Sequence, residues 1–322
     1  DGWSASEGLL QWNLLTGTIP SQLGQFSRMR TVFSLGGNKI TGTLPTQLGQ
    51  LTQLINGLNV YGNYLSEYIA TEIGRLSLVQ ENVHFEKNHF CAELPTQLGM
   101  LSSMVFDLNF HKNFFTSNIP TEFGQLSKMQ RHLNFWNNTF SSTIATELGQ
   151  LQKMEEGLYL DSNLFGSDYY KWYELYQPAI PTEIGNLEKM YSGLHFQHNT
   201  FRSPIPSELG RLDKMFDLVN FEDSWLTSTI PSELGKWHEI EDGFILNRNS
   251  LTGSVPTQLG ELLRLTGYFS IIDNLLCGDI PTQLSDLTSA TMRYGLYQSC
   301  GNVTDHGDGG GDGDSGDSSS NG

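Results

Sequence analysis

The chain has 322 residues and a formal net charge of −17, with charged residues making up only 16% of the total. Lys and Arg are not clustered, which argues against nucleic acid and against an anionic membrane surface as partners. No stretch approaches about 20 consecutive apolar residues, so the sequence predicts no membrane span.

An internal repeat organises the chain from its beginning. An apolar residue followed by Pro or Ala recurs every 25 residues, at Ile19, Leu44, Ile69, Leu94, Ile119 and Ile144. After one step of 36 residues, the spacing of 25 resumes, at Ile180, Ile205, Ile230, Val255 and Ile280. Asn recurs in phase from Asn13 to Asn274, and only Ser224 replaces it. Two markers in phase predict a repeat fold, in which each unit buries its apolar residues against its neighbours.

The second half of each unit predicts a strand. Leu58 and Val60 alternate with Asn59 and Tyr61, which is the period of a strand with one buried face. Asn63 ends this strand, and its amide can both donate to and accept from the backbone of neighbouring coils. This dual capacity explains why an Asn returns at the same place in each unit.

The first half of each unit predicts a tight helical turn. Leu48, Leu51 and Leu54 fall three residues apart and form one inward stripe. Thr46 is placed to cap this turn with its hydroxyl, and Gly49 allows neighbouring turns to approach closely. Stacked units therefore predict an α/β repeat solenoid: a curved rod with one parallel sheet on its concave face and short 3-10 or helical turns on its convex face.

These motifs resemble the leucine-rich repeat family, in particular its plant-type subclass. The matching segments read LTGTIPSQLGQF, ITGTLPTQLGQL and LTGSVPTQLGEL, and the resemblance covers about residues 8–300. The usual unit of that subclass is one residue shorter than the unit of this chain. The extra residue comes just before the strand, where Gly57, Gly157, Gly193 and Gly243 recur. The longer unit suggests a lineage outside land plants, such as algae.

The repeat divides the chain into five parts. Residues 1–13 are a partial first repeat, in which Leu10 and Asn13 end a strand, and residues 14–163 are leucine-rich repeats. An aromatic insert with a short helix occupies 164–179, repeats and a carboxyl-terminal cap occupy 180–300, and 301–322 is an acidic tail rich in Gly, Asp and Ser. The start inside a unit indicates either a fragment boundary or head-to-tail stacking on another copy.

The three cysteines predict one disulfide. Cys277 and Cys300 lie on adjacent turns, which favours a disulfide between them and an oxidising compartment. Cys91 lies seven coils from Cys277, about 34 Å away at the spacing of strands, which is too far for a disulfide. We therefore expect Cys91 to be free and buried, and pairing between molecules is the alternative.

Two sequons agree with a secreted or cell-surface glycoprotein. They place glycans on Asn137, at the concave side, and on Asn302, near the carboxyl end. Secretion also fits the predicted disulfide and the extracellular proteins of the family that the repeats resemble. We therefore expect an extracellular location.

The insert and the concave face supply the candidate contact residues. One face of the short helix predicted in the insert would carry aromatic side chains, and we assign an interface to Tyr169, Tyr170, Trp172, Tyr173 and Tyr176. The repeat frame places two rows of residues on the concave face, four and two positions before each Asn. From these rows we assign binding of a protein or a glycan to Tyr61, His84, Glu86, His111, Trp136, Tyr159 and His195.

The sequence predicts no catalysis, no cofactor and no metal. His84, Glu86 and His111 approach one another across strands but match no metal-ligand spacing, and no nucleophile elbow or phosphate loop occurs. We expect a non-catalytic extracellular scaffold that makes protein contacts as a structural subunit of an assembly, with a second copy of itself or another protein as its partner. The alternative is a receptor-like module that binds a protein, peptide or glycan. A third reading is ice binding, based on Thr pairs such as Thr16/Thr18 and Thr41/Thr43.

Overall fold

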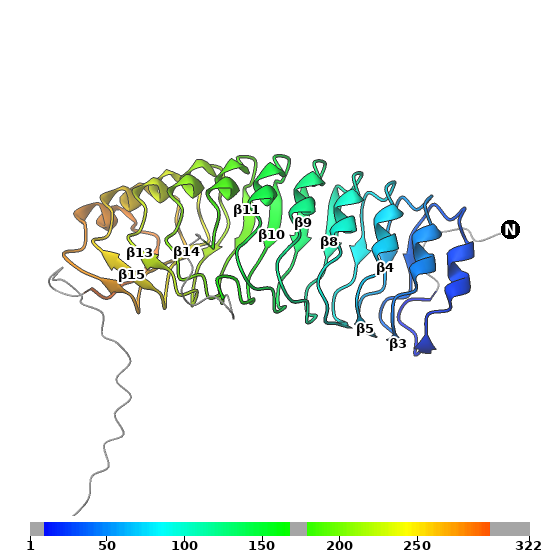
Figure 1. The fold of residues 1–322 in the computed structure, drawn as a ribbon. Helices are drawn as coiled ribbons and strands as arrows, with labels where there is room; N and C mark the ends of the chain where they lie inside the picture. The colour runs from blue at the N-terminus through cyan, green and yellow to red at the C-terminus, as the bar shows by residue number, and fades with distance from the viewer. Residues whose placement is uncertain (1–9, 168–178, 297–322) are drawn as a thin grey trace, which may run out of the picture.

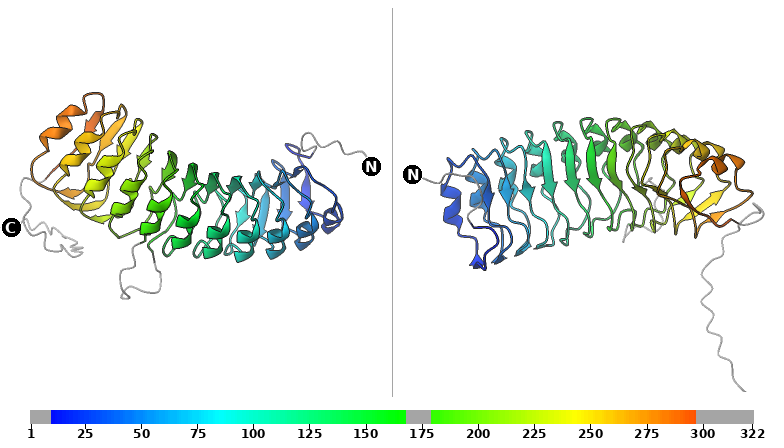
Figure 2. Two further views of the ribbon diagram at one scale, coloured as in Figure 1. Left: turned by 90° about the horizontal axis from the view of Figure 1, so that it is seen from above. Right: turned by 180° about the vertical axis from the view of Figure 1, so that it is seen from behind.

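The computed structural model describes residues 10–167 and 179–296, which form a curved rod of stacked coils (Figure 1). Seen from above, the strands line the inner side of the curve and the helical turns line the outer side (Figure 2, left). This arrangement confirms the predicted solenoid. None of the described residues lies in a helix that is long and apolar enough to cross a membrane.

The concave sheet takes one strand from each successive coil of the described chain. All its strands are parallel and follow one another in chain order. This sheet consists of β2 (Phe33–Ser34), β4 (Leu58–Asn59), β6 (Val83–His84), β8 (Phe106–Asn109), β9 (Arg131–Asn134), β10 (Glu156–Tyr159), β11 (Ser192–His195), β12 (Val219–Asn220), β14 (Gly243–Ile245), β16 (Tyr268–Ser270) and β18 (Thr291–Arg293).

The convex face consists of short 3-10 helices. These are η1 (Ser21–Gln25), η2 (Thr46–Gln50), η3 (Thr71–Arg75), η4 (Thr96–Met100), η5 (Thr121–Gln125), η6 (Thr146–Gln150), η7 (Thr182–Asn186), η8 (Ser207–Arg211), η9 (Ser232–Lys236), η10 (Thr257–Glu261) and η11 (Thr282–Asp286). The expected hydroxyl cap from Thr46 is wrong, because the residue that precedes η2 is Pro45 and no side chain caps the helix. Instead, Leu48 N–H donates to the Pro45 carbonyl at 3.0 Å.

Two shorter parallel sheets, which the sequence did not predict, lie beside the concave sheet. The first consists of β1 (Thr16–Thr18), β3 (Lys39–Gly42), β5 (Tyr64–Glu67) and β7 (His89–Phe90). The second consists of β13 (Thr227–Ser228), β15 (Ser250–Gly253) and β17 (Leu275–Leu276). The Thr pairs that suggested ice binding lie in and next to these two separate sheets, and ice binding stays a prediction.

The core is a continuous column of apolar side chains. The predicted inward stripe of Leu48, Leu51 and Leu54 is completely buried. Phe85, Phe110 and Phe135 stack in successive coils, with ring centroids 5.7 and 5.6 Å apart. The turns approach closely at the repeated Gly, as predicted: a Cβ atom on Gly49 would lie 2.3 Å from the carbonyl oxygen of Glu72 in the next coil.

The repeated Asn side chains join each coil to the one before it. The Asn63 Oδ1 atom accepts from Ile40 N–H at 3.0 Å, and its amide donates to the Leu35 carbonyl at 3.0 Å. At the exception, the Ser224 hydroxyl donates to the Phe196 carbonyl at 3.0 Å, while Phe201 N–H bonds to the Ser224 backbone carbonyl instead of a side chain. The predicted dual role of the Asn is therefore confirmed, and the backbone compensates at Ser224.

The extra residue of each unit has a left-handed backbone in several strands. Asp107, His132, Gly157 and Gly193 have φ values of 60°, 56°, 75° and 72°. These residues are left out of the strand pairing, while the residues on either side of them are paired. Phe106 pairs with Arg131 and Leu108 with Leu133, and likewise Glu156 pairs with Ser192 and Leu158 with Leu194. Because each of these four neighbouring coils carries the same local bulge, the register between them is kept.

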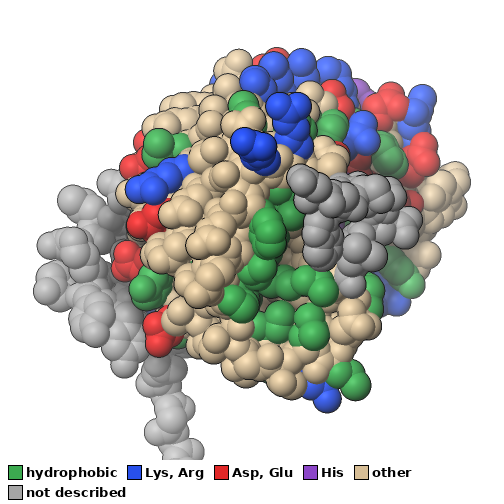
Figure 3. All heavy atoms as spheres, turned by 90° about the vertical axis from the view of Figure 1, so that its right-hand side faces the viewer, with side chains coloured by type: hydrophobic (Ala, Val, Ile, Leu, Met, Phe, Trp, Pro, Cys, Tyr) green, Lys and Arg blue, Asp and Glu red, His purple; other side chains and the backbone are tan. Residues whose placement is uncertain are grey.

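The first coils expose apolar side chains at one end of the rod (Figure 3). The large exposed ones are Trp12 and Leu14, at 75% and 76% exposure, together with Leu10, Leu15 and Phe26. The strand expected to end at Leu10 and Asn13 stays a prediction, because the positions equivalent to β2 fall at 8 and 9, outside the described residues. Trp12 N–H donates to the Gly36 carbonyl, as Gly37 N–H donates to the Tyr61 carbonyl one coil later.

Several predictions fall outside the described residues. These are the helix of the insert with Tyr169, Tyr170, Trp172, Tyr173 and Tyr176, the tail over 301–322, Asn302 and Cys300. Cys277 is buried and disulfide-bonded, and its pairing with Cys300 stays a prediction. Cys91 is free as expected, but the expectation that it is buried is wrong. Its position in the repeat lies at the surface, where the equivalent Thr41 and Thr116 are exposed too.

Candidate functional site

The concave sheet brings the predicted binding residues into two rows. The register pairs Asn109 with Asn134, Asn134 with Tyr159, and Tyr159 with His195, so one row crosses four neighbouring strands. The second row, two residues further along each coil, holds His111, Trp136, Asp161 and Gln197. A residue's position in the repeat thus determines its neighbours on this face.

A hollow of about 630 Å³ opens where three successive coils meet on the concave face. Its lining includes three of the predicted binding residues, Trp136, Tyr159 and His195. The remaining lining residues are Asn134, Asp161, Ser162, Gln197 and His198. We call these eight residues the concave pocket. The other predicted residues, Tyr61, His84, Glu86 and His111, do not line it.

Aromatic rings form part of the wall of the concave pocket. The rings of Tyr159 and His195 meet edge to face, with centroids 5.1 Å apart. Trp136 donates through Nε1 to the Ser162 hydroxyl at 3.3 Å, and its ring stacks on His111 at 5.5 Å. Lys112 Nζ lies 4.6 Å from the centroid of the Trp136 ring, which is a cation–π contact.

Glycines make the room that Tyr159 occupies. A Cβ atom on Gly157 would lie 3.0 Å from Cε2 of Tyr159, and one on Gly193 would lie 3.3 Å from its hydroxyl. The Tyr159 ring therefore lies close to both glycines. Burial raises the pKa of the Tyr159 hydroxyl, and the nearby carboxylates raise it further, so the phenol is protonated at neutral pH.

The concave pocket contains hydrogen-bond acceptors without adequate partners. Asp161 is only 6% exposed, and its carboxylate accepts a long hydrogen bond from the Ser162 hydroxyl, at 3.4 Å. Burial raises the pKa of the Asp161 carboxyl to about 6. The Gln197 Oε1 atom is buried and has no hydrogen-bond partner. The repeat frame places both residues on this face, but no signal in the sequence indicates their burial.

The imidazole of His195 is neutral at pH 7. Burial lowers its pKa, although the Asp217 carboxylate acts in the opposite direction. His198, which lines the pocket from the same coil, is more exposed and lies 3.5 Å from Asp223 through Nδ1. The charge of the concave pocket at neutral pH therefore comes mainly from Asp161.

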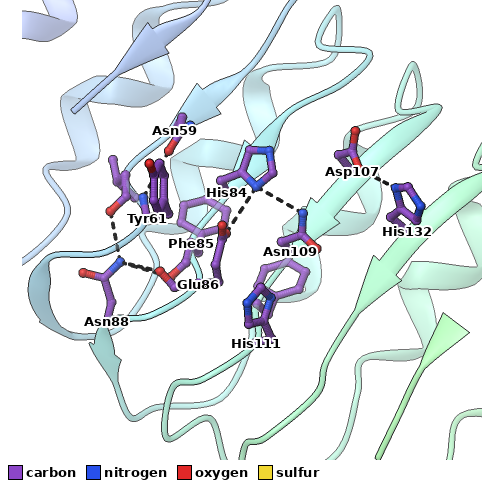
Figure 4. A network of polar contacts seen from close by, with 12 residues as sticks. Asn59, Tyr61, His84, Phe85, Glu86, Asn88, Asp107, Asn109, His111 and His132 are labelled. Carbon is purple, nitrogen blue, oxygen red and sulfur yellow. Dashed lines mark hydrogen bonds and ion pairs between the residues drawn. The ribbon is translucent and has the colours of Figure 1, made fainter. Parts of the chain in front are cut away.

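Four of the predicted residues form or border a separate polar network one to three coils earlier (Figure 4). His84 Nδ1 lies 3.2 Å from Glu86 Oε2 and 3.1 Å from the side-chain amide of Asn109. His84 Nδ1 either accepts from the Asn109 amide Nδ2 or, when protonated, donates to the Glu86 carboxylate, so the tautomer decides which of the two contacts is a hydrogen bond. Tyr61 borders this pair and packs edge to face against Trp12, with ring centroids 5.5 Å apart.

His111 lies next to this network but does not bond to it. Its Nδ1 atom is buried without a partner, and burial lowers the pKa of its imidazole to about 4. No group of three His, Cys, Asp or Glu side chains within 10–167 and 179–296 is arranged to hold a metal ion. These residues thus form a polar surface next to Trp136.

The left-handed residues create a charged cluster where β8, β9 and β10, central strands of the concave sheet, begin. His132 Nδ1 lies 2.6 Å from Asp107 Oδ1, and His132 Nε2 lies 3.5 Å from Glu156 Oε1 (Figure 4 shows the first pair). Tyr191 donates to Glu156 at 3.2 Å, and Arg131 approaches the same carboxylate at 4.0 Å. The sequence did not indicate this cluster, although Asp107 and His132 occupy the same position in adjacent units, because the two predicted rows begin only four residues before each Asn.

The predicted glycosylation site at Asn137 is sterically open. Asn137 is exposed in a left-handed conformation, whereas the adjacent Asn138 is buried in the Asn ladder.

Another hollow, of about 710 Å³, lies beside η8 and η9 and is lined mainly by Pro, Ser, Thr and Glu. It contains none of the predicted site residues.

No protein-family model matches the chain, and no curated protein matches it. Solved structures do resemble it. The complex PEPR1-AtPEP1 is 25% identical over 90% of this chain and 38% of that chain, with a TM-score of 0.74. The plant peptide hormone receptor RGFR1 in complex with RGF2 is 27% identical over 90% of this chain and 47% of that chain, with a TM-score of 0.69.

A leucine-rich-repeat protein of Leptospira interrogans shows the same fold, with 23% identity over 89% of this chain and 70% of that chain and a TM-score of 0.62. The chain spans less than half the length of the two receptor structures. Its fold is the leucine-rich-repeat solenoid of these structures. The plant-type subclass and an algal origin stay predictions.

Proposed function

We propose that this chain is a non-catalytic, extracellular protein-binding module that holds an extended segment of a partner protein against its concave face. The observation that carries this proposal is the concave pocket, where Trp136, Tyr159 and His195 come together from three coils. Aromatic side chains of this kind dominate the binding energy of protein interfaces. The resemblance to PEPR1-AtPEP1 and to the plant peptide hormone receptor RGFR1 in complex with RGF2 supports the same proposal.

The shape of the face favours an extended segment over a globular partner. The two rows of side chains run across the parallel strands, along the rod. A chain lying along these rows would meet a new pair of side chains at each coil, about 4.8 Å apart. Amides such as Asn134 and Gln197 alternate there with aromatic rings, which suits a backbone with regular donors and acceptors.

The test is selection of random displayed peptides on the folded chain. We expect the selected peptides to lose at least about tenfold of their enrichment on the double variant Trp136→Ala/Tyr159→Ala, since these rings supply much of the apolar contact area. The matched control is Tyr64→Ala, which removes an exposed aromatic residue on β5, outside the concave sheet. Circular dichroism checks that each variant is folded. Peptides that bind the double variant and the wild type equally would reject the proposal.

A second candidate is a structural subunit of an extracellular assembly. The observation that favours it is the group of exposed apolar residues at one end of the rod, among them Trp12 and Leu14 (Figure 3). Such patches mark protein contacts in many soluble proteins. This candidate and the first use different surfaces, so each can be tested separately.

A further inference from the structure

We propose that the concave pocket binds an arginine side chain of the partner segment, with Asp161 and Gln197 accepting its hydrogen bonds. This inference rests on the proposed function, because it assumes that a protein segment lies on the concave face. It adds the chemistry of recognition: a guanidinium group is the anchor of the partner.

The buried carboxylate is the first step of the argument. Asp161 is nine-tenths buried, and no Lys or Arg of the described chain lies within ion-pair distance of it. A buried carboxylate that lacks a cationic partner is unfavourable and is retained at a cost to stability. Burial raises its pKa to about 6, so at pH 7 most molecules still carry the charge. A cation that enters the pocket would remove this penalty.

The neighbouring amide supplies a second acceptor. The Gln197 Oε1 atom is buried and unpaired, and Gln197 follows Asp161 in the same row of the concave face. By contrast, the Asn134 Oδ1 atom already accepts from Trp136 N–H at 3.0 Å. The pocket therefore offers acceptors on two successive coils that lack a donor within the protein, and a partner can supply that donor.

The aromatic wall favours a flat cation. Lys112 already lies over the Trp136 ring at 4.6 Å, so the rings that remain for a partner cation are those of Tyr159 and His195. The edge-to-face pair of Tyr159 and His195 forms the adjacent wall, and His195 is neutral and does not repel a cation. The net charge of −17 attracts cationic segments over a longer range.

Two acceptors on separate coils select arginine over lysine. A guanidinium group is planar and presents five N–H donors in a fixed fork, so it can reach the carboxylate and the amide oxygen together. An ammonium group is a compact charge that suits one acceptor cluster. The volume of about 630 Å³ leaves room for the arginine stem and the adjoining backbone of the partner.

The probe is a capped pentapeptide with one arginine between pairs of glycines, compared with the same peptide carrying uncharged citrulline. Binding is followed through the indole N–H resonance of Trp136, which is assigned with Trp136→Phe. We expect the arginine peptide to bind the wild type at least about tenfold more tightly than the citrulline peptide, because only the first carries the charge. Asp161→Asn should weaken the arginine peptide at least about tenfold.

The matched control is Glu222→Gln. Glu222 lies in the same row as Asp161 and Gln197, one coil beyond Gln197 and outside the pocket, so this variant also removes one negative charge. We expect it to change the affinity less than about threefold. Equal loss in both variants would reduce the effect to general surface charge and overturn the proposal. Equal binding of the two peptides, or no shift of the Trp136 resonance up to about 20 mM peptide, would overturn it as well. A response to neutral oligosaccharides alone would assign the pocket to glycans instead.

The display experiment separates this proposal from the proposed function. Selected peptides that need Trp136 and Tyr159, but lack arginine and ignore Asp161→Asn, would overturn the arginine assignment and leave concave-face binding in place. Peptides that are rich in arginine and sensitive to Asp161→Asn support both proposals. If no peptide depends on Trp136 and Tyr159, the proposed function fails first.

Discussion

At the residue scale, the concave pocket is a place where the fold tolerates an unfavourable group. Asp161 occupies the same position in its coil as Trp136 and Gln197 do in theirs, yet it alone brings a charge into that part of the row. An Asn or a Gln at this position would satisfy the same geometry without a charge. A residue that weakens the fold at a hollow surface is typical of a binding site.

The cost of the Asp161 charge predicts how stability depends on pH. The carboxyl has a pKa of about 6 in the folded chain and about 3.8 in a free side chain, so the folded state binds more protons between these values. Protonation of the buried carboxyl therefore stabilises the folded state at low pH, and this stabilisation is lost as the pH rises through 6. We expect Asp161→Asn to stabilise the chain by about 3 kcal/mol at pH 7.5 and by less than about 1 kcal/mol at pH 4.

Urea denaturation of the wild type and of Asp161→Asn at both pH values measures this difference. The groups that face Asp161 and titrate nearby are His195 and His198 in the next coil, and both variants share them. A gain of the same size at pH 7.5 and pH 4 would contradict the assignment of the pKa shift to this carboxyl.

At the element scale, the strands are short, and the Asn ladder holds successive coils together where each strand ends. The ladder was predictable from the sequence, because an Asn that returns every 25 residues needs a role that every coil repeats. The left-handed residue inside the strands was not. Gly57, Gly157 and Gly193 indicated its place, but Asp107 and His132 adopt it as well, and these two residue types reach the left-handed region more often than most non-glycine residues.

The sequence offers a matched pair to test the ladder. Asn138 is 7% exposed, accepts from Phe115 N–H at 3.1 Å and donates to the Phe110 and Phe135 carbonyls, while Asn137 beside it is exposed. We expect Asn138→Ala to destabilise the chain by about 3 kcal/mol, because it leaves these buried groups unpaired. Asn137→Ala should change stability by less than about 0.5 kcal/mol.

Thermal or urea denaturation of protein made without glycosylation measures both variants. Asn138→Ser should lose less than Asn138→Ala, since the Ser224 hydroxyl bonds two carbonyls at the equivalent position. Equal stability of Asn138→Ala and Asn137→Ala would show that the ladder contributes little to the fold.

At the scale of the whole molecule, the repeat made the fold predictable and left the site only partly so. The spacing of Leu48, Leu51 and Leu54 and of the Asn residues was sufficient to derive the stacking of coils, because each unit faces the same packing problem. The rows of the concave face followed from the same frame. The pocket did not, since its depth depends on side-chain sizes in three coils, and the burial of Asp161 has no local signature in the sequence.

The apolar end of the rod leads to a prediction about association. We expect sedimentation velocity to show species larger than the 36.0 kDa monomer as concentration rises, because Leu14 and Trp12 expose large apolar areas. Leu14→Glu should return the chain to the monomer. The control is Leu263→Glu, a change at another exposed leucine, at 65% exposure, beyond η10. A monomer at every concentration would reject the second candidate function.

The uniform spacing of the coils has a consequence for how such a protein can change. The concave pocket needs only the coils that carry Trp136, Tyr159 and His195, and the strands of these coils pair with their immediate neighbours. Duplication or loss of a whole 25-residue unit further along the rod would lengthen or shorten the molecule without disturbing the pocket. The length of the rod and its binding specificity can thus evolve independently. The length changes with the number of repeats, and the specificity changes with a few side chains of the pocket.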